Sequence, residues 1–417
     1  MKIKKTLIAL LLCLLLLVNT RPLFAIEDPL LVPNNRFGIH ILDENDLEDA
    51  VKLVNSEGGD WGYVTLVIRE DERDIKRWQG VFNSMRQHHL IPIVRIASKQ
   101  IDSYWKKPVI NEIDSWIHFL NSLNWVVKNR YVIVANEPNH AKEWGQEISP
   151  EEYTKYLVHF SEKLKFADKD FFILPAGLDA SAPTDKEHLN ETEFIRRMLA
   201  HNENIFNYVD GWNSHSYPNP NFSGSENAVG RGTIRTYQWE LEYLKNLGVE
   251  KEFPIFITET GWAHNMEGNI LGYKTPNVIA TNFKTAFKNA WNDERIVAVT
   301  PFILNYQNPP FDIFSWKKAD GNFYDFYHEI QKMPKPKGKP TQVNTAKISF
   351  ILVSEIIKRD EKKFGIAYLE NTGQTIWKRE KLSIVSEGEK KMEIEPVSFY
   401  QTVEPENKTL AFFRSLL

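Results

Sequence analysis

Cysteine is nearly absent from the sequence: the only one among 417 residues is Cys13. A disulfide framework and a cysteine-based zinc site each need several cysteines, so both are excluded. An excess of positive charge is also missing, because 51 lysines and arginines stand against 55 aspartates and glutamates, for a formal net charge of -4. A nucleic-acid-binding domain needs a basic face, so this balance argues against that class.

Long apolar runs are missing after residue 25, and the single run before it is short. Three lysines within the first five residues precede an apolar stretch of about 12 residues at 7–18, and the small Ala25 follows. This order is typical of a secretory signal peptide at 1–25, with cleavage after Ala25. A bilayer-spanning helix needs roughly 20 residues, and an uncleaved N-terminal anchor is the alternative. We therefore expect a secreted protein, or one in the periplasm or at the cell surface.

The composition is that of a globular protein, with 42% hydrophobic and 25% charged residues, and 12 tryptophans. From Arg36 to about Met333, short apolar or β-branched runs alternate with longer stretches of helical periodicity. The apolar runs predict eight strands, at 36–42, 63–69, 91–97, 131–136, 171–176, 209–215, 255–259 and 296–304. The periodic stretches predict eight helices, at 44–55, 74–87, 110–127, 150–167, 193–199, 234–247, 277–292 and 323–331.

Eight β-then-α units over about 300 residues fit a (β/α)8 TIM barrel, so the predicted class is α/β with a barrel at 26–333. A doubly wound open sheet is the alternative. That fold would usually have fewer strands and often a glycine-rich phosphate-binding loop. The sequence contains neither a G-x-G-x-x-G motif nor a P-loop, which favours the barrel.

The pattern changes after the barrel. A Pro- and Lys-rich stretch at 334–340 predicts a stiff linker. Short strands with alternating polarity follow, at 348–353, 363–369, 381–385, 392–397 and 409–413. The stretch from Leu369 to Trp377 is similar to a turn in immunoglobulin-like domains of bacterial surface proteins. We therefore expect a small β-sandwich at 341–417 that acts as a spacer, with contact to a glycan or the cell surface as the alternative.

Two carboxylates follow apolar strands of the predicted barrel. The fourth strand continues into Asn136-Glu137-Pro138, and the seventh ends at Glu259, in Thr258-Glu259-Thr260-Gly261-Trp262. A buried carboxylate is costly unless it is paired or used, and chemistry in barrels sits at the C-terminal ends of the strands. Alone, each Glu could equally turn to solvent at a loop start. Together they can face each other across the barrel mouth, and carboxyls about 5–5.5 Å apart are what retaining glycosidases need.

These two motifs resemble those of glycoside hydrolase clan A, the (β/α)8 retaining glycosidases, over residues 36–333. Family 5 and family 39 patterns both fit in part. The resemblance implies that Glu137 is the acid/base, that Glu259 is the nucleophile and that Asn136 binds the sugar 2-hydroxyl. His215-Ser216-Tyr217, at the sixth strand, is similar to the His-x-Tyr pair of clan members. That pair implies that Tyr217 donates to the nucleophile and that His215 lines the sugar site.

The mechanism sets a requirement on the two acids. Glu259 must be ionised to attack, whereas Glu137 must start protonated, so the pKa of Glu137 should be raised by the nearby charge of Glu259. Clan members often place an arginine at the end of strand two, which here is Arg69 and would lower the pKa of Glu259. Arg95, inside the third strand, is then the candidate for a buried ion pair. His40 ends strand one and either contacts sugar hydroxyls or is a core histidine.

Tryptophans near the predicted mouth are candidates for stacking on the apolar faces of a sugar. Trp262 follows the nucleophile, Trp144 follows strand four and Trp316 follows strand eight; ordinary packing is the alternative for each. Many clan members carry a tryptophan at the end of strand eight, where this chain has Phe302-Ile303-Leu304-Asn305-Tyr306. Tyr306 or Trp316 is expected to substitute for it.

No metal or other cofactor is expected, because His201, His215 and His264 are scattered and no H-E-x-x-H motif occurs. The predicted function is a retaining glycoside hydrolase that cleaves a β-linked oligo- or polysaccharide. A non-catalytic glycan-binding or envelope scaffold on the same barrel is the alternative. A protein-interaction module centred on the C-terminal domain is a third reading.

Overall fold

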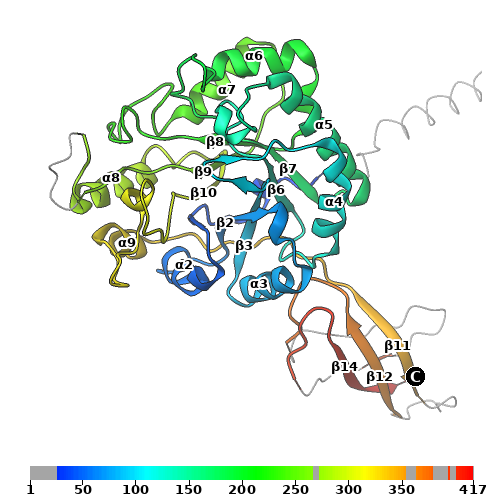
Figure 1. The fold of residues 1–417 in the computed structure, drawn as a ribbon. Helices are drawn as coiled ribbons and strands as arrows, with labels where there is room; N and C mark the ends of the chain where they lie inside the picture. The colour runs from blue at the N-terminus through cyan, green and yellow to red at the C-terminus, as the bar shows by residue number, and fades with distance from the viewer. Residues whose placement is uncertain (1–25, 266–271, 354–362, 379–392, 395–400, 417) are drawn as a thin grey trace, which may run out of the picture.

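The computed structural model describes residues 26–265, 272–353, 363–378, 393–394 and 401–416. Figure 1 shows a barrel ringed by helices, with a separate antiparallel sheet at one end. The predicted signal peptide at 1–25 lies outside the described residues. Among the helices that are described, none is both long enough and apolar enough to cross a membrane.

Eight parallel strands form the barrel in chain order. Five make one sheet and three make another, and the bridges Phe37–Val299 and Asp179–His215 join the two sheets at both seams. The strands are β1 (Gly38–Ile41), β2 (Gly62–Arg69), β3 (Leu90–Ala97), β6 (Arg130–Val134), β7 (Phe171–Pro175), β8 (Trp212–His215), β9 (Ile255–Glu259) and β10 (Ile296–Val299). Their residues are buried on almost every position, as expected for strands with a packed interior on one face and helices on the other.

The helices lie outside the strands and cover them (Figure 1). They are α2 (Leu47–Val54), α3 (Ile75–Gln87), α4 (Ile113–Ser122), α5 (Pro150–Ala167), α6 (Glu191–His201), α7 (Thr236–Asn246), α8 (Pro276–Lys288) and α9 (Asp325–Gln331). The start of α5 illustrates why the boundaries were readable: the Ser149 hydroxyl accepts from the Glu152 amide at 3.3 Å and Pro150 takes the first helical position. All eight predicted β-then-α units are present.

Short elements connect these units. A two-stranded hairpin, β4 (Gln100–Ile101) and β5 (Tyr104–Trp105), follows β3. The 3-10 turns are η1 (Pro29–Leu31), η2 (Glu44–Asp46), η3 (Glu70–Glu72), η4 (Ile110–Glu112), η5 (Ala141–Glu143), η6 (Ile205–Tyr208) and η7 (Asp312–Phe314).

The C-terminal residues form one antiparallel sheet in the order β11-β12-β14-β13. Its strands are β11 (Ala346–Leu352), β12 (Lys363–Asn371), β13 (Glu393–Ile394) and β14 (Lys408–Leu416). A small apolar core backs it, with Trp377 buried among residues such as Leu369 and Phe413. The predicted strand at 381–385 lies outside the described residues, so the immunoglobulin-like sandwich stays a prediction.

The segment predicted as a linker is packed against the barrel. Lys335 is buried, and its ammonium donates to Ser56 Oγ at 2.9 Å and to the Ile330 carbonyl at 2.7 Å. Burial lowers the pKa of Lys335 to about 8. The Lys128 amide, just before β6, donates to the Thr341 carbonyl at 2.8 Å. The C-terminal sheet therefore attaches at the end of the barrel where the strands begin.

Two carboxyl groups are buried together behind strand β8. Glu191 begins α6 and Glu240 lies in α7, and neither has any exposed surface. The Trp212 indole donates to Glu240 Oε2 at 2.9 Å. Burial and then the charge of Glu240 raise the pKa of Glu191 well above its ordinary value, and burial also raises the pKa of Glu240. The pair therefore keeps a proton at neutral pH, because burial disfavours two charged carboxylates side by side.

Replacing Glu191 by glutamine should make the protein more resistant to alkaline unfolding. Because the folded-state pKa of this carboxyl is raised, its favourable contribution is complete below the unfolded pKa and is lost as the pH rises. Glutamine keeps a donor toward Glu240 and has no charge to bury. We expect the free energy of unfolding of Glu191→Gln to exceed that of the parent by about 1–2 kcal/mol at pH 8, with a smaller gap at pH 5.

Denaturant unfolding at both pH values measures this gap. Glu193→Gln is the matched control, because Glu193 lies on the same helix with its side chain exposed and paired only with Arg196. A gap that is the same at pH 5 and pH 8 would show that the pair does not share a proton.

Candidate active site

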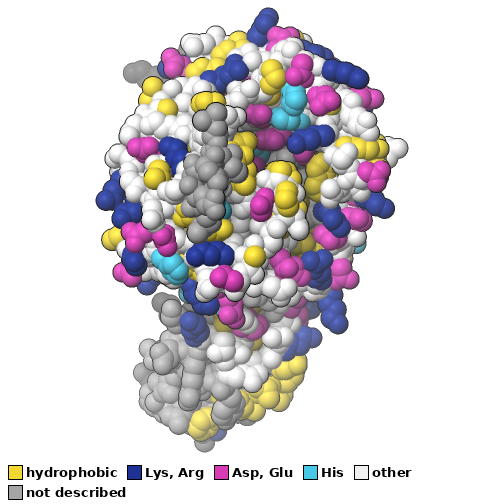
Figure 2. Space-filling model, turned by 60° about the vertical axis from the view of Figure 1, so that its left-hand side comes forward, with side chains coloured by type: hydrophobic (Ala, Val, Ile, Leu, Met, Phe, Trp, Pro, Cys, Tyr) yellow, Lys and Arg dark blue, Asp and Glu magenta, His cyan; other side chains and the backbone are white. Residues whose placement is uncertain are grey.

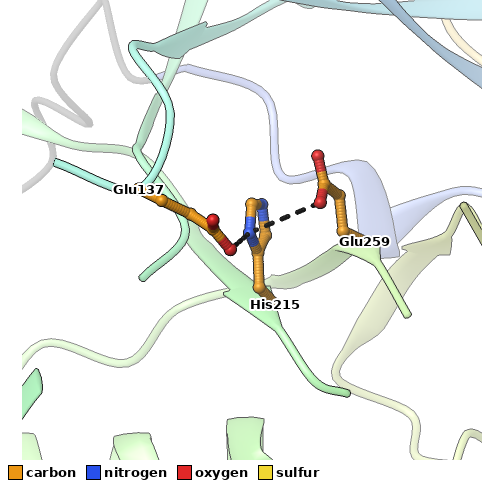
Figure 3. Close-up of side chains that lie close together, drawn as sticks. All are labelled: Glu137, His215 and Glu259. Carbon is orange, nitrogen blue, oxygen red and sulfur yellow. Dashed lines mark hydrogen bonds and ion pairs between the residues drawn. The ribbon is translucent and has the colours of Figure 1, made fainter. Parts of the chain in front are cut away.

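The polar residues that follow the barrel strands meet at the end of the barrel where the strands finish. Figure 2 shows a hollow in the barrel surface, with acidic side chains inside it and histidine at its edge. Glu137 follows β6, and His215 and Glu259 are the last residues of β8 and β9; Figure 3 shows the three side chains together. The convergence follows from closure of the barrel, which brings strands four, six and seven around one mouth.

The carboxylate of Glu259 is held at both oxygens. Arg95 Nη1 donates to Oε1 at 2.7 Å, and the Tyr217 hydroxyl donates to Oε2 at 3.1 Å. Glu259 is the last residue of β9 and only 7% of it is exposed. Burial, followed by the charge of Glu259, raises the pKa of Tyr217 well above its ordinary value, so the phenol stays a donor. Glu259 is thus a buried, oriented and charge-paired carboxylate.

Glu137 and His215 form a second pair beside it. Glu137 Oε1 lies 2.8 Å from His215 Nδ1, and the same nitrogen lies 3.8 Å from Glu259 Oε2. Figure 3 shows the imidazole standing between the two carboxylates. Glu137 has a φ of 29°, in the left-handed region that a non-glycine residue rarely adopts, and its amide donates to the Gly177 carbonyl at 3.1 Å. The backbone is therefore bent to aim this carboxyl at the histidine.

The separation of the two carboxylates limits what they can do. One carboxylate oxygen of Glu137, one of Glu259 and a ring nitrogen of His215 all lie within 4.8 Å of one another. Carboxyl pairs about 5–5.5 Å apart allow one group to attack a sugar directly, whereas inverting pairs are about 6.5–9.5 Å apart to admit a water. The site can therefore support nucleophilic attack by one carboxylate and proton transfer by the other.

The protonation states differ from the expectation for Glu137. Burial would raise the pKa of this carboxyl, but the hydrogen bond and charge of His215, with the charge of His140, lower it below its ordinary value. Burial would lower the pKa of His215, but the charge of Glu259 and the hydrogen bond to Glu137 raise it. The prediction that the pKa of Glu137 is raised is therefore wrong for the site without substrate, because it considered the charge of Glu259 and not the hydrogen bond from His215.

The arginine that contacts Glu259 is Arg95, not Arg69. Arg69 lies at the rim, where it pairs with Asp71 at 3.2 Å and Glu72 at 2.9 Å. Arg95 lies deeper, in the middle of a strand, and points into the barrel toward Glu259. The assignment of Arg69 is corrected because a rim arginine finds acidic partners next to it in the chain.

Asn136 and His40 border the same carboxylates. Arg95 donates to the Asn136 side-chain oxygen, and the Asn136 amide donates to Glu143 Oε2 at 3.2 Å. His40 Nδ1 is 3.9 Å from Glu259 Oε1, and neither ring nitrogen has a hydrogen-bond partner among the described residues. Burial, with the charge of Arg95, lowers the pKa of His40 well below its ordinary value, so the ring is neutral. His40 has no exposed surface, so it does not face an open sugar site.

The three tryptophans predicted as sugar platforms are core residues. Trp144, Trp262 and Trp316 are 1%, 2% and 1% exposed. Trp262 and Trp316 both pack against Phe283 of α8, at ring-centroid distances of 5.0 and 4.8 Å, and Trp144 packs against Tyr153 at 5.6 Å. This is a correction: each indole is buried against an aromatic residue of a covering helix, where burial of its large apolar surface is favourable, and offers no exposed face for a sugar.

A different set of aromatic side chains borders the site. Tyr217, Phe302 and Phe314 form a buried cluster, and Tyr306 packs onto it. Phe302 also lies edge-on to His40, at 5.2 Å between ring centroids. Tyr306 therefore lies next to the aromatic residues that border the site, whereas Trp316 is buried against Phe283 of α8. The sequence shows aromatic residues in these loops, but which of them come together depends on how the loops pack in the folded protein.

Sequence reasoning missed Glu143 and Gly177, which contact the site through Asn136 and Glu137. Glu143 follows the Asn136-Glu137 motif by only a few residues, so proximity in the chain was the available signal. Glu137, His215 and Glu259 are the one group in the described part of the chain whose spacing could hold a metal ion. Arg95 already supplies the positive charge on Glu259, so we assign these residues no metal.

No protein-family model matches the chain, and no curated protein matches it. A glucosidase from Croceicoccus marinus is similar in structure over 80% of this chain and 76% of its own, at 12% identity and a TM-score of 0.52. A GH39 β-xylosidase from Caulobacter crescentus covers 93% of this chain and 97% of its own, at 11% identity and a TM-score of 0.49. A triple mutant of an endo-β-1,4-glucanase from Xanthomonas axonopodis pv. citri covers 71% and 98%, at 12% identity and a TM-score of 0.47. The chain shares its (β/α)8 fold with this glucosidase, and the predicted barrel is confirmed.

Proposed function

We propose that this clan A barrel is a retaining glycoside hydrolase that cleaves a β-linked glycan in two displacements. The observation that carries the proposal is the meeting of Glu137 and Glu259, whose carboxylate oxygens come within 4.8 Å of each other at the ends of β6 and β9. That spacing is close to the separation of about 5–5.5 Å found in carboxyl pairs that form a covalent glycosyl intermediate, and shorter than the roughly 6.5–9.5 Å of inverting pairs.

The first displacement uses the two groups in different states. Glu259 attacks the anomeric carbon while the bond from that carbon to the leaving oxygen breaks, and Glu137 delivers a proton to that oxygen. Arg95 and Tyr217 each donate a hydrogen bond to the Glu259 carboxylate and so fix its direction. In the second displacement Glu137 takes a proton from a water, the water oxygen bonds to the anomeric carbon, and Glu259 is released.

The substrate class we propose is an oligo- or polysaccharide. A glucosidase has the same fold, and this likeness supports a carbohydrate substrate. Residues 1–25 have the order of a secretory signal peptide, which supports export as part of the same proposal. N-terminal sequencing of the exported protein tests the export.

The test of the function is a screen with aryl glycosides and polysaccharides, followed by NMR of the first product formed. The proposal expects hydrolysis with the anomeric configuration retained, and covalent labelling of Glu259 by a 2-deoxy-2-fluoro glycoside. An inverted product would contradict the mechanism, and binding of glycans without turnover would favour the scaffold reading.

Tyr217→Phe should slow hydrolysis by about 10–100-fold, because a hydrogen bond to a charged group is worth about 1.5–3 kcal/mol. The loss should be in kcat more than in KM, since the hydroxyl orients the nucleophile and does not need to touch the substrate. Tyr243→Phe is the control, because its hydroxyl donates to the Thr192 carbonyl on α6 at 3.2 Å, away from the site. Equal effects of the two substitutions would remove Tyr217 from the mechanism.

A further inference from the structure

We propose that His215 holds the catalytic proton before substrate binds and passes it to Glu137, and that Gly177 is the positioning residue that seats the imidazole. The inference rests on the proposed function, because it assigns the source of the proton that Glu137 delivers. The inference goes beyond a role for His215 in lining the sugar site, because it makes His215 the residue that holds the proton before Glu137 receives it.

The position of the ring supports a proton-holding role. His215 Nδ1 lies within hydrogen-bond distance of Glu137, at 2.8 Å, and 3.8 Å from Glu259. The residue is 2% exposed, so the nitrogen faces two carboxylates and almost no solvent. If the imidazole were neutral and both acids were ionised, two negative charges would lie next to each other. Arg95 would be the cation beside them, and it already contacts Glu259. A proton on Nδ1 relieves that repulsion and keeps the hydrogen bond to Glu137 charge-assisted.

The surrounding groups act in both directions: burial and the charge of Arg95 lower the pKa of His215, whereas Glu259 and Glu137 raise it. The other charged or titratable groups that act on Glu137 and His215 are Arg95, His40, His140, Glu143, Tyr217 and Glu240. His40 is kept neutral by burial, and His140 is engaged by Asp179 at 3.0 Å. Glu240 lies behind the strand that carries His215, and its buried carboxyl favours positive charge on that ring. His215 is therefore the histidine that lies between the two carboxylates, and both of them favour a proton on its ring.

The proton can move without any other reactant. In the free enzyme it is bound to Nδ1, and Glu137 is ionised. When a glycosidic oxygen reaches Glu137, the proton passes from Nδ1 to Glu137 Oε1 and then to the leaving oxygen as the bond to the anomeric carbon breaks. In the second displacement Glu137 takes a proton from water and returns it to Nδ1. Both residues end each cycle as they began, so one turnover consumes one water and no net proton.

Gly177 fixes the ring in this place. A Cβ atom built on Gly177 would lie 2.2 Å from Cδ2, 2.5 Å from Nε2 and 2.7 Å from Cγ of His215, all far inside contact distance. The Gly177 carbonyl also accepts from the Glu137 amide at 3.1 Å. Nε2 is therefore packed against the Gly177 backbone, which leaves Nδ1 as the nitrogen that faces the acids. The glycine is needed for the space that the ring fills, and it seats both members of the pair.

The first experiment needs no turnover. Histidine labelled with ¹⁵N in the full chain is followed by NMR through a pH titration, with the His215 signal assigned by its loss in His215→Asn. We expect the His215 ring to stay protonated above the ordinary histidine pKa of about 6.5. In Glu137→Gln we expect the ring to lose its proton at a lower pH. A His215 ring that is neutral at pH 6 would overturn the inference even if the protein hydrolyses glycans. A persistent imidazolium in a protein without hydrolase activity would leave the proton-holding site intact and refute the function.

The second experiment reads the same proton in the pH profile. His215→Asn should move the basic limb of kcat/KM to lower pH by about 1–2 units, because a carboxyl alone releases its proton before an imidazole does. The loss should be large for poor leaving groups and small for those that need no proton. An unchanged basic limb would overturn the role, and an equal loss for all leaving groups would reduce His215 to a structural residue.

Gly177→Ala should reproduce the His215→Asn profile, because the added methyl displaces the ring. Gly80→Ala is the matched control: Gly80 lies in α3, and a Cβ there meets no atom within 4 Å. If the basic limb of kcat/KM in Gly177→Ala lies at the same pH as in the parent enzyme, the position of the His215 ring does not depend on this glycine.

Discussion

Glu259→Gln is expected to abolish hydrolysis, with kcat lower by at least about 10⁴-fold, the size of loss seen when the nucleophile of a covalent mechanism is removed. The amide cannot attack the anomeric carbon, so the covalent intermediate of the proposed mechanism cannot form. Mass spectrometry of the protein after exposure to a 2-deoxy-2-fluoro glycoside should find an adduct on the parent chain and none on the variant.

Two controls keep that result interpretable. Removing one partner of a buried ion pair costs about 3–5 kcal/mol, and Arg95 loses its partner here, so the folded fraction must be measured at the assay temperature. Glu193→Gln, an exposed substitution on α6, should hydrolyse like the parent enzyme. Full activity or labelling elsewhere in folded Glu259→Gln would refute the nucleophile assignment.

Glu137→Ala is expected to divide substrates by their leaving groups. Loss of acid catalysis should cost about 10²–10⁴-fold for sugars with poor leaving groups, because their oxygen must be protonated as it departs. Dinitrophenyl glycosides need no such help, so their glycosylation step should be nearly unaffected. Added azide should then raise the rate by attacking the glycosyl intermediate in place of water, and should give a glycosyl azide of retained configuration.

The same variant can contradict the assignment in two ways. A loss of equal size for good and poor leaving groups would point to a structural role for Glu137. Wild-type rates on poor leaving groups would exclude it as the acid. In either case the NMR titration of His215 remains informative, since it measures the proton and not the reaction.

The local part of the site could be predicted from the chain. An apolar strand followed by Asn136-Glu137-Pro138, and another ending at Glu259, each place a carboxylate at a rim because a strand must stop where polar residues and proline begin. The parallel barrel brings those rims together. The positions of both acids therefore follow from patterns a few residues long.

The choice between arginines could not be read in the same way. Arg69 ends a strand, but the acidic residues directly after it, Asp71 and Glu72, give it partners at once. Arg95 has apolar neighbours in its own strand and can be paired only across the barrel. In the register of β2 and β3, Arg69 pairs with Ala97, so Arg95 lies two residues deeper and reaches the interior. Register and depth decided which guanidinium meets Glu259.

The aromatic residues show the same division. Trp262 follows the nucleophile by three positions, yet its indole packs on Phe283 of α8, whereas Phe302 and Tyr217 border the site from other loops. Composition indicated an aromatic-rich barrel but could not say which rings face outward, because loop residues have no fixed period.

The sequence by itself determined the β/α alternation, the eight strands and the two acids at strand ends, since periodicity and burial act over short stretches of chain. Only the tertiary structure decided that the His215 ring lies between those acids and packs against the backbone of Gly177. It also decided that the hydrogen bond and charge of His215 lower the pKa of Glu137, where the sequence predicted a raised pKa. Those properties depend on distances of about 3–4 Å between residues 40 to 78 positions apart, which are set by closure of the barrel and not by local sequence pattern.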